Sequence, residues 1–319
     1  MSETTAKGAL RAPRFKVSFL LPQFWPTWLL VGFLYLLSWL PYRWQMGMGR
    51  QLGRLLMKVV SKRAKVARRN LSLSFPGMPE AEREALLRKN FENAGAALFE
   101  TGIAWWWPNW RIKRKISIKG FEHIEANMKA GKGIFVVLFH FLNLEVHVRA
   151  AGMFHSSVGL YRPHNNAVME YLQTKGRNRS NKYMIDRKDV RAMISALRQG
   201  ELAGYLPDQD YGRHRSVFAP LFAVPDACTT IGTSIFAKVK NATTLVSVLE
   251  RLPRDKGYCI HFYPLSEPIP SGDDYEDACR VNRELEKAVA MQPELYMWMH
   301  RRYKTRPSDD LPSYYQDLK

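Results

Sequence analysis

The stretch Gly133-Ile-Phe-Val-Val-Leu-Phe-His140 decides the fold of this chain. It is a continuous apolar run, and such a run is typical of a strand that is buried on both faces. Strands of that kind occur in parallel sheets that helices cover on each side. Further strand and helix patterns alternate around this run. The sequence therefore predicts an α/β fold with a mostly parallel sheet flanked by helices.

The other expected elements follow from hydrophobic periodicity and from turn residues. Strands are expected at 115–119, 157–161, 201–206, 243–249 and 257–263. Helices are expected at 79–105, 121–129, 142–152, 166–177, 186–200, 229–240, 275–291 and 293–303. We divide the chain into four parts. Residues 1–42 are a basic flank with an apolar segment, 43–78 a basic helix with a linker, 79–306 the α/β domain, and 307–319 a tail that we expect to be frayed.

An apolar segment without any charged residue extends from Val17 to Tyr42. Pro26 suits a first helical turn and Pro41 ends the helix, which leaves roughly 21–24 Å of helix against the ~30 Å hydrocarbon core of a bilayer. Aromatic residues at both ends fit a membrane interface, and no small-residue cleavage site of a signal peptide follows. We expect a retained membrane-anchoring helix, with a thin or tilted span favoured over an interfacial position; a buried core helix is the alternative.

A basic segment follows the apolar one. Nine Lys and Arg residues and no acidic residue lie between Arg43 and Pro79, and most of them recur at helical spacing on one face. This pattern predicts a basic amphipathic helix on anionic headgroups, whereas a solvated face of a packed helix is the alternative. Basic residues are denser here than in the leading flank with Lys7 and Arg11, which places the body of the protein in the cytoplasm.

The formal net charge of the whole chain is +19, which implies an acidic partner. Nucleic acid is a poor candidate, because a charge-free segment of this length does not fit such a protein and no reading module is recognisable. The three cysteines lack the spacing of a zinc site or of a disulfide scaffold. We expect no metal and no cofactor.

A candidate general base stands at the end of the buried strand. Catalytic groups of α/β sheets gather at the carboxyl ends of strands, where His140 lies. Glu145 follows five residues later and could fix the imidazole tautomer and stabilise the imidazolium. A single His-x4-Glu pair is more often structural, so the argument needs further polar residues at the same edge.

Polar clusters follow three other predicted elements. The candidate substrate-binding residues in them are Arg162, Asn165, Asn166, Lys175, Arg177, Asp208 and Asp210. Arg clusters beside Asn side chains suit phosphate binding, although a solvated loop is the alternative for the Lys175–Lys182 run. The two aspartates could hold a cation, but two carboxylates without other ligands are thin support for such a site.

At this point the residues resemble a known family, the late lipid A acyltransferases of Gram-negative bacteria. The resemblance covers about 22–306 and is closer to the lauroyl/palmitoleoyl branch than to the myristoyl branch. The motifs that carry it are His140-Phe-Leu-Asn-Leu-Glu145, Tyr161-Arg-Pro-His-Asn-Asn166, Leu206-Pro-Asp-Gln-Asp-Tyr-Gly212, Phe218-Ala-Pro-Leu-Phe-Ala223, Trp298-Met-His-Arg-Arg-Tyr-Lys-Thr-Arg306, Arg69-Asn-Leu-Ser-Leu-Ser-Phe-Pro76 and Glu100-Thr-Gly-Ile-Ala-Trp105.

The resemblance implies transfer of a fatty acyl chain from acyl carrier protein to a 3-hydroxyacyl hydroxyl of Kdo(2)-lipid IV(A), on the cytoplasmic face of the inner membrane. His140 would be the base and Glu145 its orienting carboxylate, with Arg162 on the acceptor phosphate or the oxyanion and Asp208 supporting the site. No Gly-x-Ser-x-Gly nucleophile elbow is present, and no covalent enzyme intermediate is needed. A glycerophospholipid acyltransferase with the same pair is the alternative enzyme, and a lipid carrier without catalysis is the alternative outside enzymes.

Overall fold

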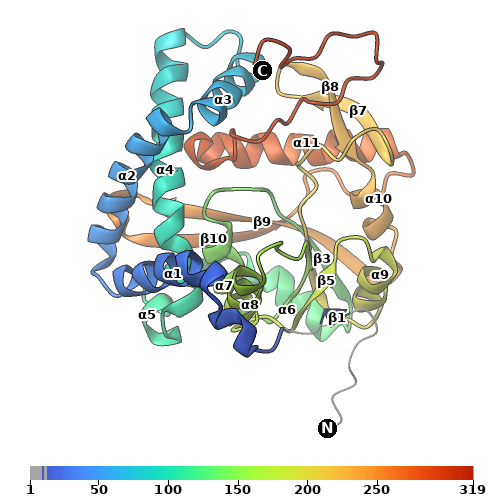
Figure 1. Ribbon diagram of the computed structural model, residues 1–319. Helices are drawn as coiled ribbons and strands as arrows, with labels where there is room; N and C mark the ends of the chain where they lie inside the picture. The colour runs from blue at the N-terminus through green and yellow to red at the C-terminus, as the bar shows by residue number, and fades with distance from the viewer. Residues whose placement is uncertain (1–8, 11–12, 319) are drawn as a thin grey trace.

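One large, mostly parallel sheet forms the centre of the computed structural model, which describes residues 9–10 and 13–318 (Figure 1). Its eight described strands lie in the order β1-β5-β4-β6-β3-β9-β10-β2. Neighbours from β5 to β9 pair in parallel, as do β10 and β2, while β1 and β10 are antiparallel to β5 and β9. The strands are β1 Ala9–Leu10, β2 Ile116–Lys119, β3 Gly133–Val137, β4 Val158–Tyr161, β5 Tyr183–Asp186, β6 Leu202–Tyr205, β9 Ala242–Leu252 and β10 Gly257–Pro264. The predicted α/β fold with a mostly parallel sheet is confirmed.

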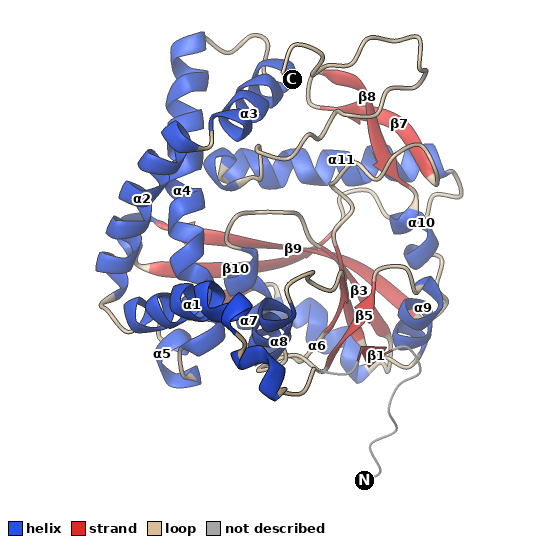
Figure 2. Ribbon diagram, viewed as in Figure 1, coloured by secondary structure: helices blue, strands red, loops and turns tan. Residues whose placement is uncertain are grey.

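Helices cover both faces of this sheet (Figure 2). One face packs against α6 Phe121–Lys129, α7 Leu144–Phe154 and α8 Ala167–Arg177. The opposite face packs against α9 Val190–Arg198, α10 Gly232–Ala237 and α11 Asp274–Met291. Every residue of β3 is buried, and its side chains alternate between the two hydrophobic cores. The central strand therefore holds the two helical layers apart, as its continuous apolar run predicted.

A long helix, α4 Glu80–Trp106, connects the two layers, because its first half packs in one core and its second half in the other. Buried Glu100 on α4 accepts hydrogen bonds from Arg251 on β9 and from Tyr258 on β10. The helix also packs closely along α2 Tyr42–Val59. A Cβ at Gly95 would overlap with the backbone of Gly49 and Gly53, so this contact requires glycine.

Several predicted elements differ from the structure. The sequence analysis missed β5 and also the separate ribbon of β7 Ser216–Leu221 and β8 Val224–Thr230. The prediction of a helix at 293–303 was wrong, because the chain is irregular after a short 3-10 turn at Pro293–Leu295. The tail is packed rather than frayed, because Tyr315 is buried and its hydroxyl bonds Asn70 and Tyr303.

The apolar N-terminal segment forms α1 Trp25–Ser38 and short 3-10 turns before it. Within the described residues, no helix has both the length and the apolarity needed to cross a bilayer, so the expected span is not confirmed. One side of α1 packs on the body: Thr27 accepts a hydrogen bond from Asn166, and the Ser38 carbonyl accepts one from Trp107. The other side leaves Leu29 and Leu36 about 70% exposed, at 74% and 68%. Lys7 and Arg11 of the basic flank lie outside the described residues.

The expected basic helix is divided in two, α2 and α3 Ser61–Ser74. Four of its arginines pair with carboxylates of the protein rather than facing outward unpaired: Arg50 with Asp255, Arg54 with Glu92, Arg68 with Glu84, and Arg69 with Asp317. Leu55 and Val59 are exposed, since the glycines of α2 and not these side chains contact α4. The segment is therefore partly a packing element and only partly a free basic surface.

The glycine contact between α2 and α4 yields a stability prediction. We expect Gly95→Ala to lower the free energy of unfolding by about 1–3 kcal/mol, because the two backbones must separate to admit the methyl group. Gly47→Ala on α2 is the matched control, since a Cβ there meets nothing within 4 Å. It should raise stability by about 0.5–1 kcal/mol through helix propensity. Denaturant unfolding in detergent measures both; equal effects would contradict the close packing.

Candidate active site

The imidazole of His140 is held by a buried carboxylate. Its Nδ1 lies 2.7 Å from Asp208 Oδ1, and its backbone N–H donates to Asp208 Oδ2 at 2.8 Å. The Asp208 side chain is 1% exposed and that of His140 is 18% exposed. Burial alone would raise the pKa of Asp208, but the His140 ring and its two hydrogen bonds outweigh burial and hold that pKa below its usual range. A neutral ring that donates Nδ1–H to Asp208 presents Nε2 as a base.

Strand pairing explains why these two residues meet. His140 follows β3 and Asp208 follows β6, and β3 and β6 are parallel neighbours whose carboxyl ends lie side by side. The irregular segment after α11 then closes over them. The Met297 backbone N–H donates to the His140 carbonyl at 3.0 Å, and the Tyr296 hydroxyl donates to the Asp208 carbonyl at 3.4 Å. The expected helix at 293–303 is absent, and carbonyls of this segment that a helix would use accept hydrogen bonds from the side chains of Asn70 and Asn90 instead.

Glu145 does not contact His140, which corrects the expected pairing. It lies in the first turn of α7 and accepts hydrogen bonds from Arg177 Nε at 3.1 Å, from Arg177 Nη2 at 2.5 Å and from Trp105 Nε1 at 3.0 Å. Burial would raise the pKa of Glu145, but Arg177 in particular reverses this and holds the pKa below its usual range. Glu145 is thus the ionised partner of a partly buried arginine.

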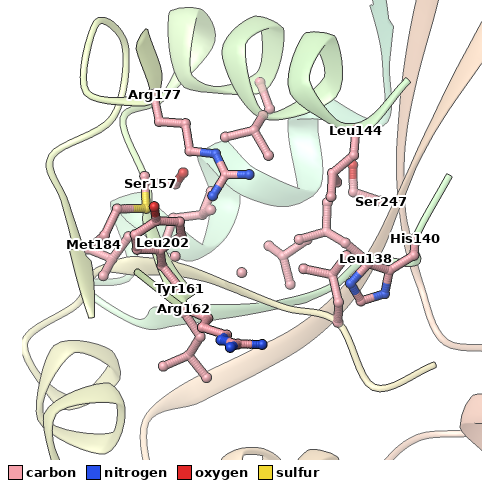
Figure 3. Close-up of a pocket in the computed structure, with 18 of the residues that line it drawn as sticks. Leu138, His140, Leu144, Ser157, Tyr161, Arg162, Arg177, Met184, Leu202 and Ser247 are labelled. Carbon is pink, nitrogen blue, oxygen red and sulfur yellow. The ribbon is translucent and has the colours of Figure 1, made fainter. Parts of the chain in front are cut away.

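An apolar cavity of about 350 Å³ begins beside His140 and extends between the sheet and the helices α7 and α8. Its wall is formed by Leu138, Leu144, Val158, Met184 and Leu202 together with other apolar side chains. Figure 3 shows Arg177 reaching into the cavity from one side, while Arg162 lies at its lower edge. Arg162 has no ion-pair partner among residues 9–10 and 13–318. The arrangement offers a base at the rim of a space that fits a hydrocarbon chain.

The remaining predicted site residues lie elsewhere. Asn166 caps α8 and bonds Thr27, while Asn165 is exposed beside it. Lys175 is exposed and contacts the Tyr171 ring. Asp210 is buried and accepts hydrogen bonds from the N–H and hydroxyl of Thr305. None of these four lines the cavity, and the side chains of Asn166 and Asp210 bond other parts of the protein.

Sequence reasoning missed two contributors to the site. Trp105 belongs to a quoted motif but received no role, and only its hydrogen bond to Glu145 reveals one. His147 Nε2 and Ser247 Oγ lie 2.7 Å apart in the interior, and Ser247 lines the cavity. Burial lowers the pKa of His147 to about 3, so this ring stays neutral.

One group of possible metal ligands occurs among the described residues. Suitable atoms of Glu250, Cys259 and His261 lie within 4.8 Å of one another on β9 and β10. The His261 ring and the Glu250 carboxylate are already 2.9 Å apart and satisfy each other. None of the three lines the cavity, so the site chemistry does not involve them.

Comparisons with known proteins agree on one family. A family profile described as bacterial lipid A biosynthesis acyltransferase matches residues 12–305, which include every site residue described above. The chain is 45% identical over 303 residues to the lipid A biosynthesis lauroyltransferase of Escherichia coli (strain K12), covering 95% of this chain and 99% of that protein. It is 42% identical to a lipid A biosynthesis acyltransferase of Haemophilus influenzae, covering 96% and 98%. It is 39% identical to the lipid A biosynthesis palmitoleoyltransferase of Escherichia coli (strain K12), covering 92% and 96%.

The partly buried ion pair yields a prediction with a pH dependence. We expect Arg177→Met to lower the free energy of unfolding by up to about 3 kcal/mol at pH 7, because Glu145 is left partly buried without a counter-charge. In the wild type the lowered pKa of Glu145 gives stability that is present above its unfolded-state pKa and is lost in acid. In the variant, burial instead raises this pKa. The difference in the free energy of unfolding between the wild type and the variant should therefore shrink as the pH falls toward about 4.

Unfolding of Glu145→Gln/Arg177→Met provides the control for this pair. Because the double variant removes both charges, it should be more stable at pH 7 than Arg177→Met alone. The ion-pair assignment would be contradicted if the loss of stability in Arg177→Met did not change with pH, or if the double variant were less stable than Arg177→Met.

Proposed function

Because the chain belongs to the bacterial lipid A biosynthesis acyltransferase family, we propose that it transfers a fatty acyl chain, lauroyl above all, from acyl carrier protein to Kdo(2)-lipid IV(A). The chain is thus an acyltransferase of lipid A biosynthesis, and the donor, the acceptor and the roles of residues are our proposal. One observation carries it: His140, fixed by Asp208, stands at the rim of an apolar cavity.

The reaction needs a base. A secondary hydroxyl of a 3-hydroxyacyl chain is a poor nucleophile until its proton is removed during the attack. His140 Nε2 takes this proton as the hydroxyl oxygen bonds the thioester carbonyl carbon, and the carbonyl oxygen becomes an oxyanion. The C–S bond then breaks, the ester carbonyl re-forms, and the leaving thiolate takes the proton back from the imidazolium.

Asp208 positions the ring and stabilises its charged form during this cycle. Its two oxygens bond the ring and the backbone of the same residue, which fixes both the tautomer and the orientation of His140. This is the role that the sequence analysis gave to Glu145. In our proposal Glu145 instead holds Arg177 at the wall of the cavity, and so shapes the space for the acyl chain.

The apolar cavity is the proposed place of the donor chain. Its wall of Leu, Val and Met side chains removes the methylene groups from water, at about 0.8 kcal/mol for each CH₂. A chain in this cavity has its thioester at the rim, beside His140. The relatives named for lauroyl and palmitoleoyl transfer support a fatty acyl donor of that size class.

We also propose that the protein works on the cytoplasmic face of the inner membrane. The exposed apolar side of α1 suits insertion among headgroups and upper acyl chains, with the helix axis in the membrane plane because its other side packs on the body. The net charge of +19 favours both an anionic membrane and an acidic carrier protein. The acceptor would then reach the site from the bilayer.

The catalytic proposal predicts that His140→Ala lowers turnover by at least about 100-fold, the usual contribution of a positioned base. The variant loses the ring bond to buried Asp208, so thermal unfolding checks that the protein assayed is folded. Asp208→Asn should also lower kcat strongly, because an amide cannot hold the same tautomer and charge. His123→Ala, on α6 and outside the cavity, is the control and should keep wild-type turnover. The assay offers the acyl carrier protein thioester as donor, and a lysophospholipid competes with the lipid A precursor as acceptor. Mass spectrometry of the acylated products measures transfer. Wild-type turnover in His140→Ala would contradict the mechanism.

The membrane proposal predicts that the intact protein stays on anionic vesicles at high salt. Leu29→Ser/Phe33→Ser/Leu36→Ser should make it salt-releasable, because only the screened basic surface remains. These side chains are exposed, so their loss does not disturb the fold. The control is Met291→Ser/Leu311→Ser, two exposed apolar side chains outside α1. Release of the unaltered protein by salt, or retention of the triple variant on the vesicles at high salt, would contradict this proposal.

A further inference from the structure

A second, larger cleft of about 780 Å³ borders the catalytic histidine. It shares His140, Leu160, Tyr161, Arg162 and Leu206 with the apolar cavity. Beyond these shared residues the two spaces diverge to opposite faces of the sheet: the cavity lies under α7 and α8, whereas the cleft lies beside α9 and α10. The edge of the sheet at His140 therefore separates two spaces.

The cleft differs from the cavity in charge. Arg162, Arg187, Lys188 and Arg215 line it, and no acidic residue is among its described lining residues. No ion pair joins any of these four cations to a carboxylate within the described part of the chain. Elsewhere many arginines are paired, including Arg50 and Arg54, whereas these exposed, unpaired cations gathered on one cleft suit an anion from outside the protein.

The backbone of two of these residues is held in place beside the cleft. The Arg187 N–H donates to the Tyr161 carbonyl at 2.9 Å, which joins the loop after β5 to the end of β4. The Arg215 carbonyl accepts from Ile231 N–H at 3.0 Å, and Arg215 has a φ of +56°, which a side-chain-bearing residue rarely adopts. Such a backbone persists only where its surroundings hold it, so Arg215 is anchored beside the cleft.

We propose that this cleft binds the phosphate-bearing head of the acyl acceptor while the donor chain occupies the apolar cavity. The inference rests on the proposed function and adds to it the place of the second substrate. Arginine guanidinium groups suit phosphate, because their paired N–H donors match two phosphate oxygens. The apolar floor, formed by Tyr205, Ile235 and Phe236, leaves room for part of a lipid chain beside the charged head.

Covalent reach favours the acceptor over the donor as the source of the phosphate. With bonds of about 1.5 Å, a phosphate about eight bonds from the reacting hydroxyl lies within roughly 10 Å of it. The phosphate of a carrier's pantetheine arm is about a dozen bonds from the thioester, or roughly 15 Å when the arm is extended. Because His140 itself lines the cleft, a headgroup bound there needs only the shorter link to a hydroxyl at His140.

The test compares the full-length enzyme with Arg187→Gln/Arg215→Gln, which leaves Arg162 and His140 intact. The acceptor is offered with its sugar phosphates and after phosphatase treatment, and the donor is acyl carrier protein thioester. We expect the double variant to raise the apparent KM for the phosphorylated acceptor about tenfold and to leave the donor KM unchanged. The dephosphorylated acceptor should show the same KM with both enzymes. Arg198→Gln, an exposed cation of α9 outside the cleft, is the matched control and should behave as wild type.

Each other outcome overturns a stated part of the account. An unchanged acceptor KM in the double variant overturns the cleft assignment, as does an equal rise for the dephosphorylated acceptor. A rise in the donor KM instead assigns the cations to the carrier's phosphate and also overturns it. No transfer by the wild-type enzyme overturns the proposed function itself. Thermal unfolding of the variant, together with the single variants Arg187→Gln and Arg215→Gln, separates loss of binding from loss of fold.

Discussion

A buried carboxylate that must be satisfied organises this structure. Asp208 lies almost without contact to water, and an unpaired charge there would cost several kcal/mol. His140 supplies two hydrogen bonds to it, one from the ring and one from the backbone. This requirement ties the end of β3 to the end of β6, and the segment with Tyr296 and Met297 then closes over both. His140, the proposed base, is thus held in its orientation because buried Asp208 must be hydrogen-bonded by groups of the protein.

The same sheet edge separates two kinds of chemistry. On one face, helices α7 and α8 enclose an apolar cavity, and the charge of Arg177, which lines it, is neutralised by Glu145. On the other face, cations remain unpaired within the described residues. A hydrocarbon chain and an anionic head would therefore approach the same imidazole from opposite faces of one sheet. This division suits a reaction that joins two amphipathic substrates.

More of the fold than of the site could be predicted from the sequence. The apolar run of β3 identified the sheet and placed His140 at its edge, because burial on both faces is a local property of composition. The pairing of His140 with Glu145 was wrong because it relied on proximity in sequence. Glu145 starts α7 and turns toward Arg177, whereas Asp208 reaches His140 through a strand pairing that spacing cannot reveal. The segment around Trp298 was expected to be helical, and tertiary hydrogen bonds decided otherwise.

The most direct test of this account is the tautomer of His140, measured by ¹⁵N NMR of histidine-labelled protein at neutral pH. The account predicts a proton on Nδ1 in the wild type, loss of this preference in Asp208→Asn, and its retention in Glu145→Gln. A tautomer that survives in Asp208→Asn, or that is lost in Glu145→Gln, would contradict the claim that Asp208 holds the catalytic base.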